Sequence, residues 1–349
     1  MNNATAGMKN SSRFGLPGKL LAALALTTSS LLLLTGCISE TAPDPNETAI
    51  TVYSGRSEEL VADLFEQFTA ETGIQIQARY GDSAELSAQI LEEGQNSPAD
   101  VFFSQDAGAL GALSAAGVLV QLPEELLELV PSEYRASDSS WVGVSGRSRV
   151  LSYNPNLVSE LPTSVLELAD PKWQGKIGIA PSNASFQAFV TGLRVLKGDA
   201  VATEFLAGMK KNAVLFEKNS QILDAVEAGQ IALGLINHYY WYEKSAEIGA
   251  DNMVSKITWF SAGDPGNLVN VAGVGVLSDS AAAEQFAAWL LGETAQLYFV
   301  NQTFEYSLTS ASVTAGLRPL SELEGPSIDL NDLATLSETL ELIRDAGLN

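Results

Sequence analysis

Two adjacent phenols, Tyr239 and Tyr240, are the residues of this sequence whose type and position best suit metal chemistry. They follow directly after an apolar, strand-like run at 231–236. Because consecutive strand residues point to opposite faces, the two phenols can reach one ligand only if the chain turns or becomes helical there. A phenol, with an ordinary pKa of about 10, binds metals poorly near neutral pH, but a hard, highly charged cation such as Fe(III) stabilises the phenolate. The pair therefore indicates either a ferric site or a packed aromatic pair at a domain surface.

Other metal-binding side chains are scarce, which narrows the kind of metal. His238 is the only histidine and Cys37 the only cysteine in 349 residues. Zinc, nickel and copper sites usually need several histidines or thiolates, so the sequence excludes such clusters. We interpret His238 as a structural residue or one that supports neighbouring ligands. The chain also lacks a Ser-His-Asp set, a P-loop and a Gly-x-Gly-x-x-Gly motif after a strand, so we expect no enzyme.

The first 37 residues have the pattern of a bacterial lipoprotein signal. A basic segment precedes an apolar stretch at 20–34, and a Leu-Thr-Gly-Cys sequence ends at Cys37. In such signals the cysteine becomes the lipidated first residue of the mature chain. An uncleaved membrane anchor is the alternative, although the apolar stretch is short for a span. We predict a flexible tether at 38–48 and an extracytoplasmic protein that is attached to the membrane by lipid alone.

The mature chain would be strongly acidic. Without residues 1–37 it keeps 16 basic and 42 acidic residues, a formal charge of −26. Nucleic acids and anionic membrane surfaces are bound by clustered Lys and Arg, so the charge disfavours both as partners. Scattered acids usually form a solvated face, so the charge does not by itself indicate a cation site. The remaining 312 residues are long enough for two domains.

Hydrophobic periodicity predicts two doubly wound units. The first has strands at 49–53, 74–80 and 99–103 and helices at 57–72 and 84–92. The second has strands at 176–180, 213–216 and 231–236 and helices at 185–196, 200–211 and 220–228. This order is typical of mostly parallel sheets with helices on both faces. Strand-rich runs at 141–153 and 268–277 predict a hinge of two crossing strands between α/β lobes, with ligand held at the facing carboxyl ends of strands.

Six short motifs, in this order and spacing, resemble the substrate-binding proteins of ABC-type ferric iron importers, the bacterial transferrins. The motifs lie at 50–56, 97–102, 145–150, 171–173, 218–220 and 236–241. The resemblance covers nearly the whole mature chain. It implies an α/β, two-lobed periplasmic-binding-protein fold of class II type, in which crossing hinge strands join two doubly wound sheets. It also implies a monomer that delivers Fe(III) to an ABC permease and its ATPase.

The predicted lobes are discontinuous in sequence. We assign residues 49–147 and about 270–320 to lobe 1, and residues 148–269 and about 321–349 to lobe 2.

The resemblance assigns iron ligands to the second lobe. It makes Tyr239 and Tyr240 the paired ligands and Tyr153 a third phenolate. Three phenolates would neutralise Fe(III) and leave coordination positions for an anion or water. Arg147 and Arg149 lie two residues apart on a predicted strand, so they share a face and could hold carbonate bidentately. Hinge salt bridges are the alternative role for these arginines.

Phosphate is the bound anion in some members of the family. The small polar residues that hold it there align here with Asn183, Ala184, Ser185, Asn219 and Asn237. A helix beginning near Ser185 would offer backbone N–H groups to an anion. Asn183 and Ala184 depart from the family pattern, so the sequence favours carbonate over phosphate.

The first lobe departs most from the family. Some members place a histidine where this chain has Ser57 or a tyrosine where it has Glu58, and one subgroup places a glutamate ligand where it has Gln105. The candidate first-lobe contributors are therefore Arg56, Ser57, Glu58 and Gln105. We hypothesise that Glu58 completes the metal shell or pairs with Arg56, although a first-turn acid often serves only its helix.

Two other functions stay open at the level of sequence. The same fold could bind a small organic ion, such as a polyamine, an amino acid or an anion. A cell-surface enzyme that uses a tyrosine or arginine pair, for example on a phosphate ester, is the other. The second is weakened by the lack of a general base near Tyr239.

Overall fold

The structure is a computed structural model that describes residues 49–310 and 312–348. The predicted signal at 1–37, the lipidation site Cys37 and the tether at 38–48 lie outside the described residues. Within them, no helix has the length and apolar character needed to span a membrane.

The described residues form ten strands, of which eight make one hydrogen-bonded path in the order β2-β1-β3-β9-β4-β7-β5-β6, while β8 and β10 pair with β4 off this path. The strands are β1 (Ala49–Ser54), β2 (Gln75–Tyr80), β3 (Val101–Ser104), β4 (Trp141–Tyr153), β5 (Ile177–Ile179), β6 (Ala213–Leu215), β7 (Leu233–Asn237), β8 (Lys256–Thr258), β9 (Val269–Val276) and β10 (Tyr306–Ser307).

Helices cover the faces of this path. They are α1 (Glu58–Thr72), α2 (Ser83–Glu93), α3 (Ala107–Ala115), α4 (Glu124–Leu127), α5 (Ala184–Lys197), α6 (Asp199–Asn212), α7 (Asn219–Glu227), α8 (His238–Ile248), α9 (Ala281–Leu290), α10 (Glu293–Asn301) and α11 (Leu336–Asp345). Every strand and helix predicted for the two doubly wound units is present, with ends shifted by at most two residues.

Local sequence explains these elements. In α1 the buried residues Val61, Leu64, Phe65 and Phe68 recur at helical spacing, so one face of the helix packs on the sheet. The helix ends at Gly73, which adopts a left-handed conformation with φ of 79° that glycine enters without steric cost.

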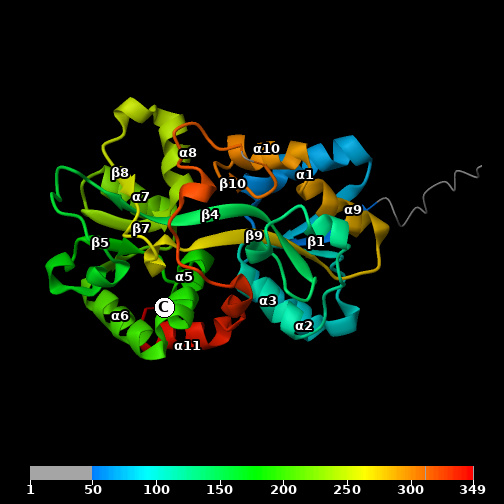
Figure 1. Cartoon of the computed structure of the whole chain (residues 1–349), viewed down its shortest axis with the longest axis horizontal. Helices are drawn as coiled ribbons and strands as arrows, with labels where there is room; N and C mark the ends of the chain where they lie inside the picture. The colour runs from blue at the N-terminus through cyan, green and yellow to red at the C-terminus, as the bar shows by residue number, and fades with distance from the viewer. Residues whose placement is uncertain (1–48, 311, 349) are drawn as a thin grey trace, which may run out of the picture. The chain divides into compact units, whose positions relative to one another are not determined.

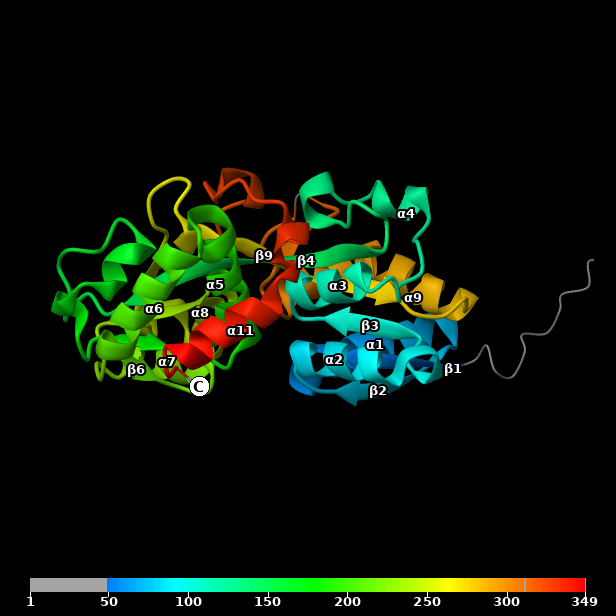
Figure 2. The ribbon, with the colours of Figure 1, turned by 90° about the horizontal axis from the view of Figure 1, so that it is seen from below.

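Two sheets make up the path, and each forms the centre of one lobe. Sheet A contains β1, parallel to β2 and β3, together with β9, β4 and β10, and sheet B contains β7, parallel to β5, together with β6, β8 and the end of β4. Figure 2 shows α1, α2, α3 and α9 around sheet A, and α5 to α8 with α11 around sheet B. The predicted two-lobed α/β fold is confirmed.

β4 is the strand that joins the sheets. Its first part pairs with β9 and its last part with β7, and Arg149 lies directly opposite Asn237 of β7. The predicted hinge strands at 141–153 and 268–277 correspond to β4 and β9, which run between the lobes in Figure 1. Because β4 belongs to both sheets, the two doubly wound units form one continuous path.

Residues 330–334 pack against lobe 1, and α11, which follows them, packs against lobe 2. A glycine allows the first of these contacts. Leu330 and Leu333, which the sequence assigned to lobe 2, are buried with α3 in the core of sheet A, while Ile343 of α11 is buried in the core of sheet B. A Cβ added at Gly111 of α3 would lie 2.9 Å from the Cβ of Ala334. The close approach of residues 333–334 to α3 therefore depends on glycine.

We expect Gly111→Leu to destabilise the protein by about 1–3 kcal/mol, because its side chain would overpack this contact. Equilibrium unfolding in urea measures the change. Ala115→Leu is the control, because Ala115 lies on the same helix but is exposed. Equal stability of the two variants would contradict the assignment.

Candidate functional site

The paired phenols lie where a strand becomes a helix. β7 ends at Asn237, and Tyr239 and Tyr240 belong to the first turn of α8. Their ring centroids are 4.2 Å apart with an interplanar angle of 31°. Tyr239 is 1% exposed and Tyr240 is half-buried. The helical turn brings neighbouring side chains together, which a continued strand would not do.

Tyr239 is a neutral phenol in the protein without a cation. Burial, and then the neighbouring Tyr240, raise the pKa of Tyr239 well above its usual value, whereas the charge of Arg147 acts in the opposite direction. Among residues 49–310 and 312–348 the Tyr239 hydroxyl has no hydrogen-bond partner. A buried polar atom of this kind needs an explanation, and contact with a bound ligand is one.

Arg147 and Arg149 extend from the same face of β4 and are 1% and 2% exposed. Arg149 donates to the Asn237 side-chain oxygen at 3.3 Å and to the Leu235 carbonyl at 3.0 Å. Arg147 donates to the Gln105 carbonyl. Within the part of the chain that the structure describes, Nε of Arg149 and both Nε and Nη1 of Arg147 have no hydrogen-bond acceptor. These buried donors suit an anion.

Burial also lowers the pKa of both arginines, because it disfavours their charged form. It lowers the pKa of Arg149 to about 9, an effect that ionised Tyr240 and Tyr239 would partly oppose. Burial, followed by the charge of Arg56, lowers the pKa of Arg147. An anion beside these groups would reverse that effect, because it favours the charged form of each guanidinium.

A buried ion pair from sheet A adjoins Arg147 and Arg149, which we call the arginine cluster. Arg56, in the turn after β1, donates to both Glu305 carboxylate oxygens, at 2.8 and 3.0 Å, and Arg147 Nε lies 3.9 Å from the same carboxylate. Burial acts to lower the pKa of Arg56, but Glu305 outweighs it and raises that pKa; ionised Tyr239 and Tyr240 would raise it further, so the turn lies near the phenols. α10, which precedes Glu305, runs beside α1 in Figure 1.

Glu305 therefore replaces Glu58 as the expected partner of Arg56, which corrects that part of the hypothesis about Glu58. The structure pairs Arg56 with Glu305, whereas Glu58 is an exposed first-turn residue of α1. Glu305 also accepts hydrogen bonds from Ser145 and Thr303. The sequence carried no signal for it, because 249 residues separate it from Arg56 and it is one of 42 acids.

The small polar residues of the second lobe meet at the start of α5. Asn237 donates to Ser185 at 2.9 Å, and Asn219 donates to Asn183 at 3.0 Å. Asn183 caps the helix by accepting from the Ser185 backbone N–H at 3.1 Å. This N–H is thus already satisfied within the chain, which weakens the helix start as an anion site.

The first-lobe candidates occupy different environments. Gln105 lies in the turn before α3, where its carbonyl accepts from Arg147. In the described residues its side-chain oxygen is without a hydrogen-bond donor, although it is buried. Ser57, like Glu58, is exposed. The structure thus brings Gln105 and Arg56 to the arginine cluster, and leaves Ser57 and Glu58 on the surface.

Tyr153 is not brought to the paired phenols, which corrects its assignment as a third phenolate. It lies opposite Leu233, at the beginning of β7, whereas the phenols follow Asn237 at the end of β7. Four strand residues correspond to about 13 Å. The half-buried Tyr153 ring packs against the hydrophobic core of sheet B, which explains a tyrosine there without a metal.

Neither carboxylates nor histidines gather into a rival metal site. Over the described ranges, no group of three or more His, Cys, Asp or Glu side chains is placed to hold a metal ion. Phenol oxygens are therefore the metal donors that the site offers.

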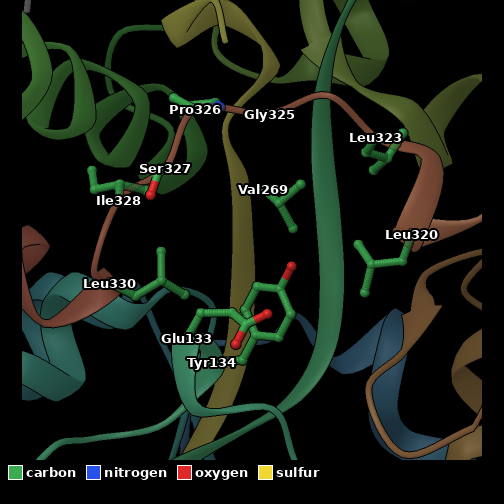
Figure 3. Close-up of a pocket in the computed structure, with 10 residues that line it drawn as sticks. All are labelled: Glu133, Tyr134, Val269, Leu320, Leu323, Gly325, Pro326, Ser327, Ile328 and Leu330. Atoms are coloured by element: carbon green, nitrogen blue, oxygen red, sulfur yellow. The ribbon is translucent and has the colours of Figure 1, made fainter. Parts of the chain in front are cut away.

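A separate pocket of about 270 Å³ lies on the other face of the crossing strands (Figure 3). It includes Val269, which pairs with Ser148, whereas Arg147 pairs with the next residue, Asn270. Neighbouring strand residues point to opposite faces, so this pocket lies away from the arginine cluster. Its lining is Glu133, Tyr134, Val269, Leu320, Leu323, Gly325, Pro326, Ser327, Ile328 and Leu330.

Comparisons with known proteins identify the family of this chain. The model of a family described as bacterial extracellular solute-binding protein matches residues 50–305. An Fe(3+)-binding periplasmic protein of Serratia marcescens is 36% identical over 335 residues, covering 94% of this chain and 98% of the relative. The major ferric iron-binding protein of Neisseria meningitidis serogroup B is 36% identical over 316 residues, covering 88% and 96%.

A solved structure supports the same relationship. Iron-bound HitA from Pseudomonas aeruginosa has a TM-score of 0.82 and 36% sequence identity, and the match covers 86% of this chain and all of HitA. The predicted resemblance to ferric-ion-binding proteins is therefore confirmed.

We expect Glu305→Gln to destabilise the protein at pH 7 by roughly 3–5 kcal/mol, because it leaves Arg56 buried without a counter-charge. Burial acts to raise the pKa of Glu305, but Arg56 and Arg147 outweigh it and hold that pKa below the usual 4.5. The carboxylate therefore stabilises the fold fully above pH 4.5, and this contribution is lost as the pH falls through the lower folded-state value.

Urea unfolding of wild type and variant at neutral and acidic pH measures both effects. A difference in unfolding free energy that stayed constant down to the acid limit would contradict the ion-pair assignment.

Proposed function

This chain belongs to the bacterial extracellular solute-binding protein family, and from that premise we propose that it captures Fe(III) and delivers it to an ABC permease and its ATPase. The observation that carries the proposal is the pair of adjacent phenol rings at the start of α8, with the buried Tyr239 hydroxyl near Arg147. Relatives named for ferric iron supply the identity of the ion.

The chemistry of the pair favours a trivalent cation. Ionising Tyr239 inside the protein is costly, because burial raises its pKa. A divalent ion would offset this cost less than Fe(III), whose higher charge and hardness favour phenolate oxygen. In this proposal Tyr239 and Tyr240 are the phenolate ligands.

The charges near the phenols support a divalent anion as the second bound species. Arg56 pairs with Glu305, and Arg147 lies near both Glu305 and Asp106, so these two carboxylates, when ionised, leave one positive charge among Arg56, Arg147 and Arg149. Fe(III) with two phenolates adds one more. Carbonate, with two negative charges, would balance both. Its predicted holders are Arg147 and Arg149, which carry the unsatisfied donors.

Phosphate at Ser185, Asn219 and Asn237 is the less favoured arrangement, since these residues already bond to one another or to Asn183. From the first lobe, Gln105 is the best placed contributor because of its contact with Arg147. Ser57 and Glu58 would contribute only if closure of the lobes carried them to the ion.

The proposal includes attachment to the outside of the membrane. The signal at 1–37 would be removed, Cys37 would carry the lipid, and residues 38–48 would tether a monomeric binding protein. In cells, Cys37→Ser should move the protein from the membrane fraction to the soluble extracytoplasmic fraction. A variant that stays with the membrane would contradict lipid attachment.

Loading with Fe(III) should colour the purified protein through phenolate-to-iron charge transfer. Tyr239→Phe and Tyr240→Phe should each weaken iron binding by more than about 100-fold, because even supporting residues of metal sites typically contribute 10–100-fold. Visible spectra and competition with a chelator measure both effects.

Tyr153→Phe is the matched control, since it removes a phenol from the same lobe at a distance from the pair. It should keep the wild-type band and affinity. A colourless wild-type protein would favour the organic-ion alternative, and loss of colour in Tyr153→Phe would return Tyr153 to the ligand set.

The anion part of the proposal has its own test. Iron binding by wild-type protein should strengthen when bicarbonate is added to carbonate-free, phosphate-free buffer. Arg149→Gln should lose most of this response, whereas Asn219→Ala should keep it. The opposite result, with phosphate strengthening binding through Asn219, would assign the anion to the start of α5.

A further inference from the structure

His238 lies at the junction of three elements that the iron proposal needs. It precedes Tyr239 directly, and its side chain is fully buried. One ring nitrogen, Nδ1, lies 3.2 Å from the backbone nitrogen of Ser148 in β4. The other, Nε2, lies 2.9 Å from the carbonyl oxygen of Phe304. The imidazole thus contacts the strand that joins the sheets and the residue before Glu305.

The partners of the ring specify one neutral tautomer. A carbonyl oxygen only accepts, so Nε2 carries the proton and donates to Phe304. Nδ1 then accepts from the Ser148 N–H at 3.2 Å, a shorter contact than its 3.4 Å separation from the Ser148 carbonyl oxygen. Burial lowers the pKa of His238 to about 4, in agreement with a neutral ring at neutral pH.

The backbone at Phe304 is held in an unusual conformation. Its φ of 54° lies in the left-handed region, which a bulky non-glycine residue rarely adopts. Such a conformation persists where surrounding contacts determine it, and the hydrogen bond from His238 is one such contact. The next residue is Glu305, which binds Arg56.

Ring packing also restricts the imidazole. Its centroid lies 4.7 Å from that of Tyr306 and 6.0 Å from that of Tyr239. A histidine held by two hydrogen bonds and by these rings, together with that of Tyr242 at 6.4 Å, has little rotational freedom, and the backbone of the first turn of α8 shares this constraint.

We propose that His238 is a positioning residue that connects the phenol pair to β4 and to the Arg56–Glu305 ion pair through its two ring nitrogens. This inference rests on the proposed function. It assigns to the one histidine a role in setting ligand geometry, and it does not make the histidine a ligand. The Phe304 hydrogen bond is the more important contact, because it joins the phenols to the ion pair.

Three substitutions separate the contacts. His238→Phe keeps the packed ring and removes both hydrogen bonds. His238→Gln places an amide donor near the position of Nε2, so it can still bond to Phe304. His238→Asn places an acceptor near the position of Nδ1, so it keeps only the Ser148 contact. We expect iron affinity to fall 10–100-fold in His238→Phe and His238→Asn, and less than about tenfold in His238→Gln.

The phenolate-to-iron charge-transfer band reports ligand geometry. If His238 served only the stability of the fold, its substitution would leave the band unchanged. Its wavelength and intensity should change in His238→Phe and His238→Asn and stay near wild type in His238→Gln. Tyr242→Phe is the matched control, because it removes a hydrogen bond from α8 to the Gly316 carbonyl and leaves both ring nitrogens of His238 paired. It should keep the wild-type band.

The outcomes distinguish the two proposals. Thermal unfolding is measured with and without iron for every variant. Lower melting temperatures with an unchanged band, affinity and iron-induced stabilisation would reduce His238 to a structural residue and overturn the inference, while the iron proposal would stand. A colourless wild-type protein would overturn the proposed function and this inference with it.

Discussion

Buried positive charge at the point where β4 passes between the sheets is the constraint on which the site depends. Arg56, Arg147 and Arg149 are each at most 2% exposed, and only Arg56 has a bidentate carboxylate partner. Removing a guanidinium from water costs several kcal/mol unless hydrogen bonds and opposite charges compensate. The fold tolerates this cost at one place only among its described residues, beside the phenol pair. The stability of the fold alone does not explain why several buried arginine N–H groups without acceptors gather at this place.

The sheet arrangement makes the concentration possible. β4 is long enough to pair with β9 at one end and with β7 at the other, so side chains from one strand face the ends of strands in both sheets. The turn after β1 brings Arg56, and the transition from β7 to α8 brings the phenols. Arg56 and the phenols lie at the ends of elements, where a polar side chain is free of the sheet pattern, whereas Arg147 and Arg149 lie within β4.

The elements were predictable from sequence because hydrophobic periodicity is a local property. The tyrosine pair was identifiable for the same reason, since two adjacent phenols after an apolar strand form a local pattern. Glu305 was not identifiable, because its partner lies 249 residues away and no local pattern distinguishes it from other acids. Tyr153 was assigned through resemblance alone, and the register of β4 against β7 places it far from the pair. Register follows from pairing between distant segments, which periodicity does not specify.

Charge and geometry together explain why cation and anion would bind as a unit. Fe(III) alone would add positive charge next to two arginines that already lack full compensation, and an anion alone would leave the Tyr239 hydroxyl without a partner. Bound together, the cation favours the phenolate and the anion favours the guanidinium groups, so each species lowers the cost that the other would meet. In the proposed function, the excess of arginine over carboxylate would couple two weak sites into one strong site. Selectivity for Fe(III) would follow from the same charge balance, because a divalent cation would supply one positive charge less to the two phenolates and the anion.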